Sequence, residues 1–428
     1  MLANASLLLA FFISSSLPIA ATLIITALIL SFVYSPLPLF LAASEIFWKV
    51  STEFTLTSIP LFVLLGEILL RSGVAERMYG AVALWLNRLP GGLLHANIGA
   101  STLFSATSGS SVATAATIGT VALPEIRRRG YNERLFLGSL AAGGTLGILI
   151  PPSIHLIIYG MITNTSVPKL YLAATIPGLL LAALFSLIIV VICLAKPGYG
   201  GEPIKATWRQ RFASLADLIP IILLFVIVIG SIYTGFATPT EAASLGLVFA
   251  LGLAWWYGRL SLALLHECFI GAMKATAMIM LIVLASYFLN FVLSVIGLSQ
   301  QLTSFISGLG LSPLQTMLVI IAFFVVLGCF LESLSMLVTI TPLVAPIVIG
   351  LGYDPIWFGV ILIILLEVAL ITPPVGINLY VVQAIRGRGS IQDVIAGSLV
   401  FVLSMFCLIG LLLAFPEIAL WLPMRFSE

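Results

Sequence analysis

Charged residues are scarce in this chain of 428 residues: lysine, arginine, aspartate and glutamate together make up only 8% of it. An ordinary soluble domain is about a quarter charged. Apolar residues make up 61%, more than a soluble fold of this size could bury. The shortage of charge excludes a soluble enzyme, and the net charge of +2 gives no indication of nucleic-acid binding. The composition predicts a polytopic membrane protein.

Cysteine and histidine are also few and far apart. Four cysteines without a C-x-x-C pair and three scattered histidines exclude a recognisable zinc or iron–sulfur site and a disulfide framework. The chain has no G-x-x-x-x-G-K-[ST] loop for nucleotide phosphates. It also lacks the Asp-Asp-x-x-Asp, His-Glu-x-x-His and Gly-x-Ser-x-Gly motifs that an intramembrane enzyme could use. We therefore expect no enzymatic activity and no cofactor.

Long apolar runs make up most of the sequence. A helix of about 20 apolar residues is long enough to cross a bilayer. Nine full spans are predicted, at residues 5–33, 53–70, 134–163, 168–195, 216–234, 239–257, 275–296, 355–385 and 391–415. Two further apolar stretches, 93–124 and 312–348, are broken near the middle by small or polar residues. Unpaired backbone at membrane depth needs a covering of protein or water. Each stretch is therefore predicted to be a re-entrant helical hairpin with its tip near the midplane.

Lysine and arginine are concentrated in alternate loops. With a cytoplasmic N-terminus, the cytoplasmic loops are 71–92, 125–134, 196–215, 258–274 and 386–393. These loops hold 15 of the 18 basic residues, as the positive-inside rule requires, and only Lys49, Lys169 and Arg425 fall elsewhere. We expect the C-terminus on the opposite side of the membrane.

Part of the chain recurs at a constant offset of 222 residues. The identical pairs are Pro124 and Pro346, Gly130 and Gly352, Tyr131 and Tyr353, Phe136 and Phe358, Pro151 and Pro373, and Pro152 and Pro374. Arginines in one loop match uncharged residues in its counterpart, so equivalent loops face opposite sides and the repeats are inverted. We expect repeat 1 at 1–196, a cytoplasmic loop with a linking span at 197–237, and repeat 2 at 238–428.

Inverted repeats with broken helices at equivalent positions are typical of secondary transporters, whose site lies at the repeat interface near the midplane. A channel could share the symmetry, but paired hairpins and paired broken spans favour alternating access. Two amphipathic stretches, 39–50 and 260–274, each precede a span. We interpret them as interfacial helices that brace a fixed scaffold.

The first hairpin turns at Ser105-Ala-Thr-Ser-Gly-Ser-Ser111, where five of seven residues carry a hydroxyl group. Free carbonyl and hydroxyl oxygens at helix breaks are suited to Na⁺. Small residues also allow close helix packing, but their concentration at a hairpin tip favours contact with an ion or substrate.

A double proline interrupts each broken span, at Ile150-Pro-Pro-Ser153 and at Thr372-Pro-Pro-Val375. Proline lacks an N–H and clashes with the preceding turn, so each pair frees backbone carbonyls. The helix N-termini that follow carry partial positive charge suited to an anionic substrate. Gly376 and Asn378 follow the second break. His155, after the first, is better explained as a packed histidine than as a proton carrier.

Three acids lie within predicted membrane segments: Glu67, Glu332 and Glu367. Such residues are functional candidates because an ionised carboxylate is costly there. Glu332, at the second hairpin tip, is the strongest of them. Glu367 occupies the position where repeat 1 has Thr145, and Glu67 lies one helical turn from Arg71, which indicates a structural pair.

Five motifs together carry a resemblance to a known family: Gly66-Glu-Ile, Ser108-Gly-Ser-Ser-Val-Ala-Thr, Ala141-Ala-Gly-Gly-Thr-Leu-Gly-Ile-Leu-Ile-Pro-Pro-Ser-Ile, Ala237-Thr-Pro-Thr-Glu-Ala and Thr372-Pro-Pro-Val-Gly-Ile-Asn. Over nearly its whole length the chain resembles the large membrane subunit of tripartite ATP-independent periplasmic (TRAP) transporters, the DctM-like family. The resemblance implies Na⁺-driven uptake of an organic acid across a bacterial inner membrane by an elevator mechanism. The C-terminus would then be periplasmic. It also implies two partners, a small four-helix membrane subunit (DctQ-like) and a periplasmic substrate-binding protein (DctP-like).

The resemblance places Na⁺ near the hairpin tips and the unwound helices, and no other metal is expected. The residues expected to bind Na⁺ are Ser108, Gly109, Ser110, Ser111, Ile150, Pro152, Glu332, Ser333, Thr372, Pro374 and Gly376. The residues expected to contact the substrate are Ser105, Thr145, Ser153 and Asn378. The alternative is a stand-alone Na⁺/divalent-anion symporter with the same two-hairpin architecture, which would need no binding protein.

Overall fold

The computed structural model describes residues 4, 7–8, 11–12, 17–298, 300–301, 304, 308 and 310–426. These residues form helices joined by short turns, with no strand among them and one isolated bridge between Tyr131 and Gly200. The all-α prediction is confirmed for this part of the chain.

The first half of the chain is mostly helical up to the loop that begins near residue 200. Its elements are α2 (Ile19–Tyr34), η1 (Leu39–Ala42), α3 (Ala43–Ser51), η2 (Phe54–Thr57), α4 (Ser58–Arg71), α5 (Val74–Leu86), α6 (Leu93–Ser108), α7 (Ser111–Arg129), α8 (Glu133–Thr145), η3 (Leu146–Ile148), α9 (Ile154–Thr163), α10 (Val167–Ala195) and η4 (Pro197–Tyr199).

The second half of the chain contains both short and long helices. They are α11 (Trp208–Ser214), η5 (Leu215–Asp217), α12 (Ile219–Phe225), η6 (Val226–Gly230), α13 (Ser231–Tyr233), α14 (Pro239–Trp256), α15 (Leu262–Val295), α17 (Pro313–Gly328), α18 (Ser333–Gly350), α19 (Pro355–Leu370), α20 (Ile377–Arg386), α21 (Ile391–Ala414) and α22 (Glu417–Arg425).

Polar residues define several helix starts, because a side-chain oxygen there can accept a backbone N–H that the helix leaves unpaired. Ser110 does so before α7, Asn132 before α8, Ser153 before α9 and Glu332 before α18. These caps fix the points at which the chain resumes a helix after each break, and so they position the candidate site.

Five helical segments of the described chain are long and apolar enough to cross a membrane: Phe54–Arg71, Val167–Ala195, Leu262–Val295, Ser333–Gly350 and Ile391–Ala414. A sixth is obtained if the bent pair Trp208–Asp217 and Ile219–Tyr233 counts as one span. The predicted spans 134–163 and 355–385 are each divided into two shorter helices, at the double prolines. The prediction of a first span at 5–33 lies partly outside the described residues.

One predicted boundary is wrong. The stretch 260–274 was expected to form a separate interfacial helix before a span at 275–296, but α15 runs through both without interruption for 34 residues. No proline interrupts the segment from 262 to 295, so nothing ends the helix. The first such stretch is separate, because η2 and the turn at Thr52 and Glu53 divide α3 from α4.

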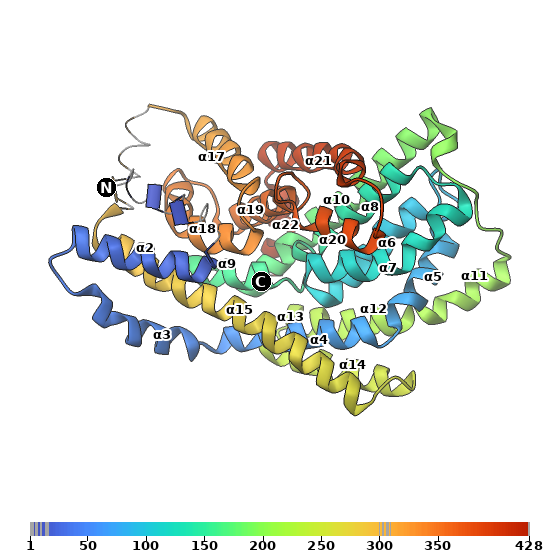
Figure 1. The fold of residues 1–428 in the computed structure, drawn as a ribbon, viewed down its shortest axis with the longest axis horizontal. Helices are drawn as coiled ribbons and strands as arrows, with labels where there is room; N and C mark the ends of the chain where they lie inside the picture. Colours follow the sequence, from blue (N-terminus) through green and yellow to red (C-terminus); the bar gives the residue numbers. More distant parts are fainter. Residues whose placement is uncertain are drawn as a thin grey trace.

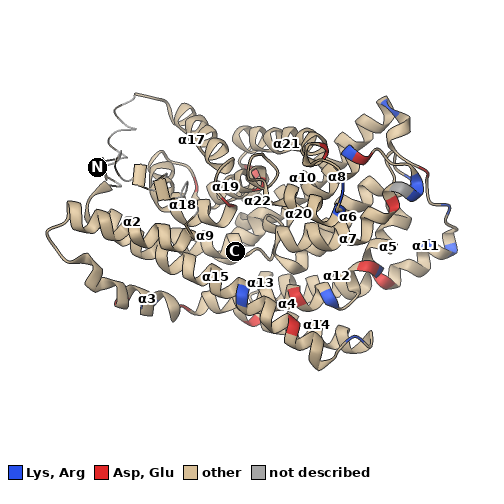
Figure 2. Ribbon diagram, viewed as in Figure 1, with Lys and Arg blue, Asp and Glu red and all other residues tan. Residues whose placement is uncertain are grey.

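The helices fall into two groups. α15 packs against α2, α3 and α4, and α4 also packs against α14; these helices run along the lower edge of Figure 1. The second group is centred on α8, which contacts α6, α7, α20 and α21. Charged residues gather around α4, α5, α7, α8, α11 and α14, whereas α2, α17 and α18 are almost free of them (Figure 2).

Candidate functional site

The first hairpin turns at residues 108–111, called the first tip. Gly109 ends α6 with φ 58°, a left-handed conformation that glycine adopts without steric cost. The hydroxyls of Ser108 and Thr114 lie 3.0 Å apart, and Thr114 Oγ1 donates to the carbonyl oxygen of Ser110 at 2.8 Å. Short polar side chains thus close the turn, while the tip stays buried or half-buried.

The first broken span is interrupted at residues 150–153, called the first break. The chain leaves η3, passes the cis Pro151–Pro152 bond and resumes a helix at Ile154. Ser153 Oγ donates to the carbonyl of Ile148 at 2.5 Å and accepts from the amide of Leu156 at 3.4 Å. The whole break is buried.

The first tip packs directly on the first break. A Cβ atom added to Gly109 would lie 2.8 Å from the carbonyl oxygen of Pro152, and one added to Gly147 would lie 2.6 Å from that of Ser110. These distances are shorter than real Cβ atoms show, so the two backbones touch because both positions are glycine. The structure therefore brings together two of the segments expected to bind Na⁺.

The second half repeats this arrangement. The chain turns between α17 and α18 at residues 329–332, and residues 332–335 are called the second tip; residues 372–378, which include the cis Pro373–Pro374 bond, are called the second break. The amide of Val375 donates to the carbonyl of Cys329 at 3.2 Å, which ties the second break to the turn before the second tip.

Glu332 holds the second tip together. Its Oε2 accepts hydrogen bonds from the amide and the hydroxyl of Ser335, both at 3.0 Å, and its Oε1 accepts from the hydroxyl of Ser333 at 3.0 Å. Both carboxylate oxygens are thus engaged, and the carboxylate caps the N-terminus of α18, where partial positive charge favours it. Glu332 takes the place that Ser110 has at the first tip, 222 residues earlier.

Two of the contacts between the halves involve the tips and breaks. His155 Nε2, just after the first break, lies 3.2 Å from Ser333 Oγ at the second tip. Asn378 Nδ2, in the second break, donates to the carbonyl of Ala141 in α8 at 3.2 Å. The two tips and the two breaks therefore belong to one connected region.

The residues expected to contact the substrate differ in whether their side-chain oxygens already form hydrogen bonds. Ser105 Oγ and Asn378 Oδ1 are buried and have no hydrogen-bond partner among the residues that the structure describes. The hydroxyl of Thr145 donates to Ala142 at 2.8 Å, and that of Thr372, expected to bind Na⁺, donates to Val368 at 2.6 Å. Ser105 Oγ and Asn378 Oδ1 are thus the oxygens of this set that form no hydrogen bond with the described residues.

The other intramembrane acids have opposite surroundings. Glu67 forms an ion pair with Arg71, as the spacing indicated. Glu367 is 0% exposed, and neither of its carboxylate oxygens has a hydrogen-bond partner among the described residues.

A cleft of about 1500 Å³ lies beside this region, and none of the predicted site residues lines it. One wall comes from the first helix group, with Lys49 on α3 and Asn290 on α15. The other wall comes from the helices that follow the first break and the second tip, with Thr163 on α9 and Pro346 on α18. Further lining residues are 164–166, in the turn after α9, and 349–350, at the end of α18. The predicted topology places both segments on the extracytoplasmic side of the membrane.

Several residues that shape the candidate site were not predicted from the sequence. Gly144 and Gly147 allow α8 and η3 to approach the first hairpin, and the glycine-rich run 141–147 was a usable signal, since small residues mark close helix contacts. Thr114 closes the motif that begins at Ser108, but its contacts with Ser108 and Ser110 were not predicted. The link from His155 to Ser333 had no signal in a single sequence, because it depends on how distant segments meet.

A helical membrane protein in which two interrupted spans and two hairpin turns meet in a single region is organised as a transporter. The family model of the tripartite ATP-independent periplasmic transporter, DctM component, matches residues 6–418. The chain belongs to this family.

Named relatives agree with this assignment. The chain is 34% identical over 377 residues, 88% of either chain, to the C4-dicarboxylate TRAP transporter large permease protein DctM of Pseudomonas aeruginosa. It is 33% identical over 413 residues, 96% of either chain, to the sialic acid TRAP transporter large permease protein SiaM of Vibrio cholerae. Among solved structures, the YdaH transporter of Alcanivorax borkumensis has a similar fold, with a TM-score of 0.58 and 16% identity over 97% of this chain and 99% of that one.

Proposed function

We propose that this large permease subunit imports a small organic acid anion, with Na⁺ as the coupling ion and with a separate binding protein delivering the substrate. The family supports a transport role. The relatives named for C4-dicarboxylates and sialic acid support a carboxylate-bearing substrate.

The observation that carries the proposal is the meeting of both tips and both breaks in one region. Breaks in intramembrane helices leave carbonyl oxygens without intrahelical donors, and such oxygens coordinate Na⁺ in secondary transporters. The first tip adds the hydroxyls of Ser108, Ser110 and Ser111. The second tip adds a carboxylate, Glu332, which would supply a full negative charge near a bound cation.

The substrate is assigned to the helix starts that follow the breaks. α9 begins at Ile154 and α20 at Ile377, and each N-terminus carries partial positive charge that favours an anion. The free oxygens of Ser105 and Asn378 lie on the hairpin and break that flank these helix starts. We assign Ser105 and Asn378 to substrate contact on this basis, and Ser153 because it caps α9. Thr145 is assigned to substrate contact from the family resemblance alone.

The proposed mechanism moves one helix group against the other. Residues 1–196 and 238–428 act as inverted repeats, and Ser110 and Glu332, 222 residues apart, cap equivalent helices. The group of α2, α3, α4, α14 and α15 serves as the fixed scaffold of an elevator, and the group with the tips and breaks carries the substrate. The cleft between these groups is the extracytoplasmic entrance.

Whether uptake requires the partner proteins distinguishes the proposed function from that of a stand-alone symporter. The chain would be reconstituted in liposomes alone, and together with a small membrane subunit and a substrate-binding protein of the same transporter family. Uptake of radiolabelled succinate and of sialic acid would be measured in both preparations. We expect accumulation of one of these anions only in the complete system. Robust uptake by this chain alone would assign it to the stand-alone alternative.

A further inference from the structure

A groove of about 720 Å³ lies between the start of α8, the end of α10 and the start of α21. Its walls are apolar at one end, with Val191 and Ile192 on α10 and Val400 on α21. Its other end is polar, with Arg134, Lys196 and Tyr199 beside the acids Glu133 and Asp393. The groove plays no part in the transport site described above.

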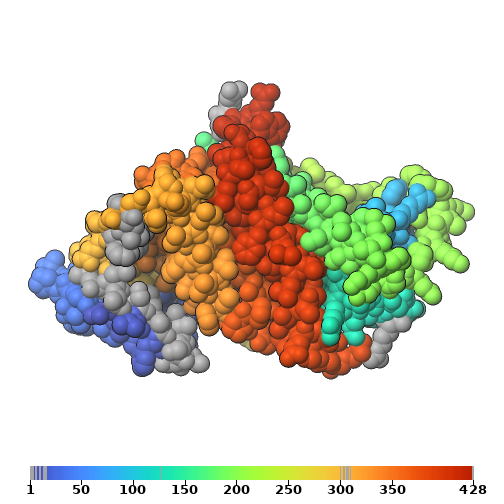
Figure 3. All heavy atoms as spheres, turned by 90° about the horizontal axis from the view of Figure 1, so that it is seen from above, coloured from blue at the N-terminus to red at the C-terminus, as the bar shows by residue number. Residues whose placement is uncertain are grey.

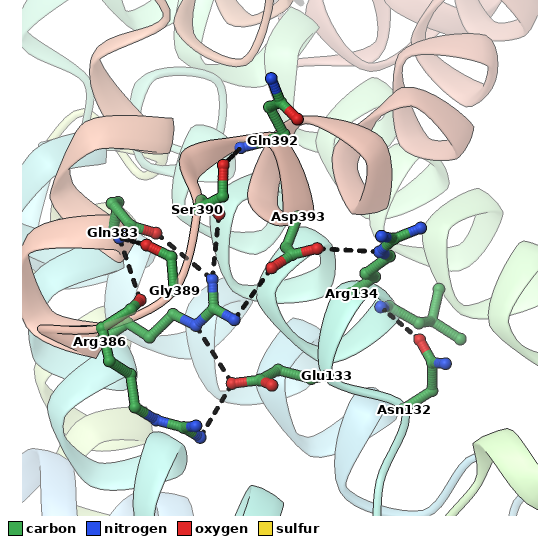
Figure 4. A network of polar contacts seen from close by, with 11 residues as sticks. Asn132, Glu133, Arg134, Gln383, Arg386, Gly389, Ser390, Gln392 and Asp393 are labelled. Atoms are coloured by element: carbon green, nitrogen blue, oxygen red, sulfur yellow. Dashed lines mark hydrogen bonds and ion pairs between the residues drawn. The ribbon is translucent and has the colours of Figure 1, made fainter.

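The polar end has an excess of positive charge. Figure 4 shows Arg386 between Glu133 and Asp393, with ion pairs of 3.1 Å to each. Arg388 also pairs with Glu133, at 2.9 Å, and Arg134 Nε pairs with Asp393 at 2.9 Å. Three arginines thus share two carboxylates.

Two cations at this end face the groove with unused capacity. Arg134 is 67% exposed and bonds Asp393 through Nε, which leaves its terminal nitrogens available. The ammonium of Lys196 lies 5.3 Å from the ring centroid of Tyr199 and forms no ion pair with any described carboxylate. An anionic group between them would meet two donors and no unneutralised acid.

The apolar end continues onto surfaces that face lipid in a membrane-spanning protein. Val191 and Leu194 on α10, and Leu399 and Leu403 on α21, are each more than half exposed. In Figure 3 the red C-terminal helices adjoin the green segment around residue 200 on one face of the molecule. The groove therefore leads from exposed hydrocarbon-facing side chains to two cations at the level where the helices end.

We propose that this groove binds one anionic phospholipid, with its phosphate between Arg134 and Lys196 and an acyl chain along Val191 and Val400. Clusters of basic residues at the cytoplasmic ends of membrane helices select anionic lipid headgroups in this way. The inference rests on the proposed membrane orientation, which places loops 125–134, 196–215 and 386–393 in the cytoplasm. It does not depend on Na⁺ coupling.

Native mass spectrometry of the detergent-purified chain tests the site without any transport assay. The chain would be titrated with dioleoyl phosphatidylglycerol, with dioleoyl phosphatidylcholine and with the soluble headgroup glycerol phosphate. We expect the first molecule of phosphatidylglycerol to bind at least tenfold more tightly than phosphatidylcholine, and glycerol phosphate not to bind. Equal binding of the two lipids, or binding of glycerol phosphate alone with the same affinity, would overturn the proposal.

Substitutions then locate the site. Lys196→Gln and Arg134→Gln should each reduce the preference for phosphatidylglycerol, and Ala396→Trp should lower binding of that lipid by filling the groove from an exposed position. Lys205→Gln with Arg209→Gln is the matched control, since it removes two exposed cations from the same predicted face outside the groove. A preference that survives Lys196→Gln and Ala396→Trp, or that the control also abolishes, would contradict the assignment. Arg134 pairs with Asp393, so Arg134→Gln can lower stability as well as lipid binding. If that variant fails to fold, the result for Lys196→Gln decides the test.

Discussion

The imidazole of His155 lies 3.2 Å from the hydroxyl of Ser333, and this contact joins the first turn of α9, just after the first break, to the second tip across 178 residues of sequence. Ser333 in turn donates to Glu332, which caps α18. A chain of polar contacts therefore connects a helix break in one half of the molecule to the only carboxylate at either tip.

The first prediction concerns this contact. Ser333→Ala and His155→Phe should each lower the transport rate, and the double variant should lose less than the two losses combined. Residues in direct contact couple, and a hydrogen bond contributes about 1 kcal/mol. A double-mutant cycle on initial uptake rates would show a coupling energy of about 0.5 kcal/mol or more.

Ser398 supplies the control for that cycle. Its hydroxyl bonds only within its own helix, to Ile395 at 2.9 Å. Ser398→Ala combined with His155→Phe should give additive effects. Additivity in the cycle with Ser333 as well would show that the two halves are not coupled through this contact.

The second prediction concerns Glu332. Glu332→Gln keeps the shape of the side chain but removes its charge, and the amide nitrogen cannot accept the bonds that Ser335 donates. We expect normal membrane insertion and Na⁺-dependent uptake, per folded transporter, reduced at least tenfold, which corresponds to about 1.4 kcal/mol. Glu76→Gln, an exposed acid on α5, should transport normally.

A purely structural role for Glu332 would give a different result. If the carboxylate only fixes the hairpin, Glu332→Gln will transport at nearly the normal rate with unchanged Na⁺ affinity, and only a bulky substitution will lower the amount of folded protein. Loss of a helix cap by itself costs about 1 kcal/mol of stability, so uptake must be normalised to folded protein.

The third prediction tests the packing of the first tip on the first break. Gly147→Ala would place a methyl group 2.6 Å from the carbonyl oxygen of Ser110, and overpacking of this kind costs about 1–3 kcal/mol. Its thermal unfolding midpoint in detergent should fall clearly. Gly410→Ala, where a Cβ meets nothing within 4 Å, should leave the midpoint unchanged. Equal midpoints for both variants would mean that the tip does not rest on the break.

The fourth prediction concerns Arg386, whose side chain is 5% exposed between α8 and α21. Arg386→Gln leaves Glu133 and Asp393 without their shared partner and should destabilise the protein by roughly 2 kcal/mol. Arg128, 75% exposed and paired only with Glu125, provides the comparison, because an exposed pair contributes about 0–1 kcal/mol. Unfolding of both variants in detergent would rank them, and a larger loss for Arg128→Gln would contradict this account.

The sequence predicted the helical class, the two double-proline interruptions and the turns of both hairpins, because proline, glycine and hydroxyl residues act locally on the backbone. It also anticipated the pair of Glu67 with Arg71, one helical turn apart. The continuity of α15 through residue 274 was missed, since an amphipathic stretch and an apolar span can belong to one helix when no proline separates them.

Contacts between distant segments could not be predicted in this way. Nothing near His155 in the sequence indicates Ser333 as its neighbour, and nothing near Glu133 indicates that Arg386 and Arg388 will share its carboxylate. These pairs depend on how the two halves fold against each other. The periodicity and spacing of one sequence carry no information about that arrangement.

The central claim is that Na⁺ drives uptake through the region formed by the two tips and the two breaks. Its most direct test is uptake of labelled substrate into proteoliposomes that contain this subunit, the small subunit and the binding protein, with an imposed Na⁺ gradient or an imposed pH gradient. We predict accumulation with inwardly directed Na⁺ and none when Na⁺ is replaced by K⁺ or choline at the same membrane potential. Equal uptake from Na⁺-free medium driven by the pH gradient alone would contradict the account.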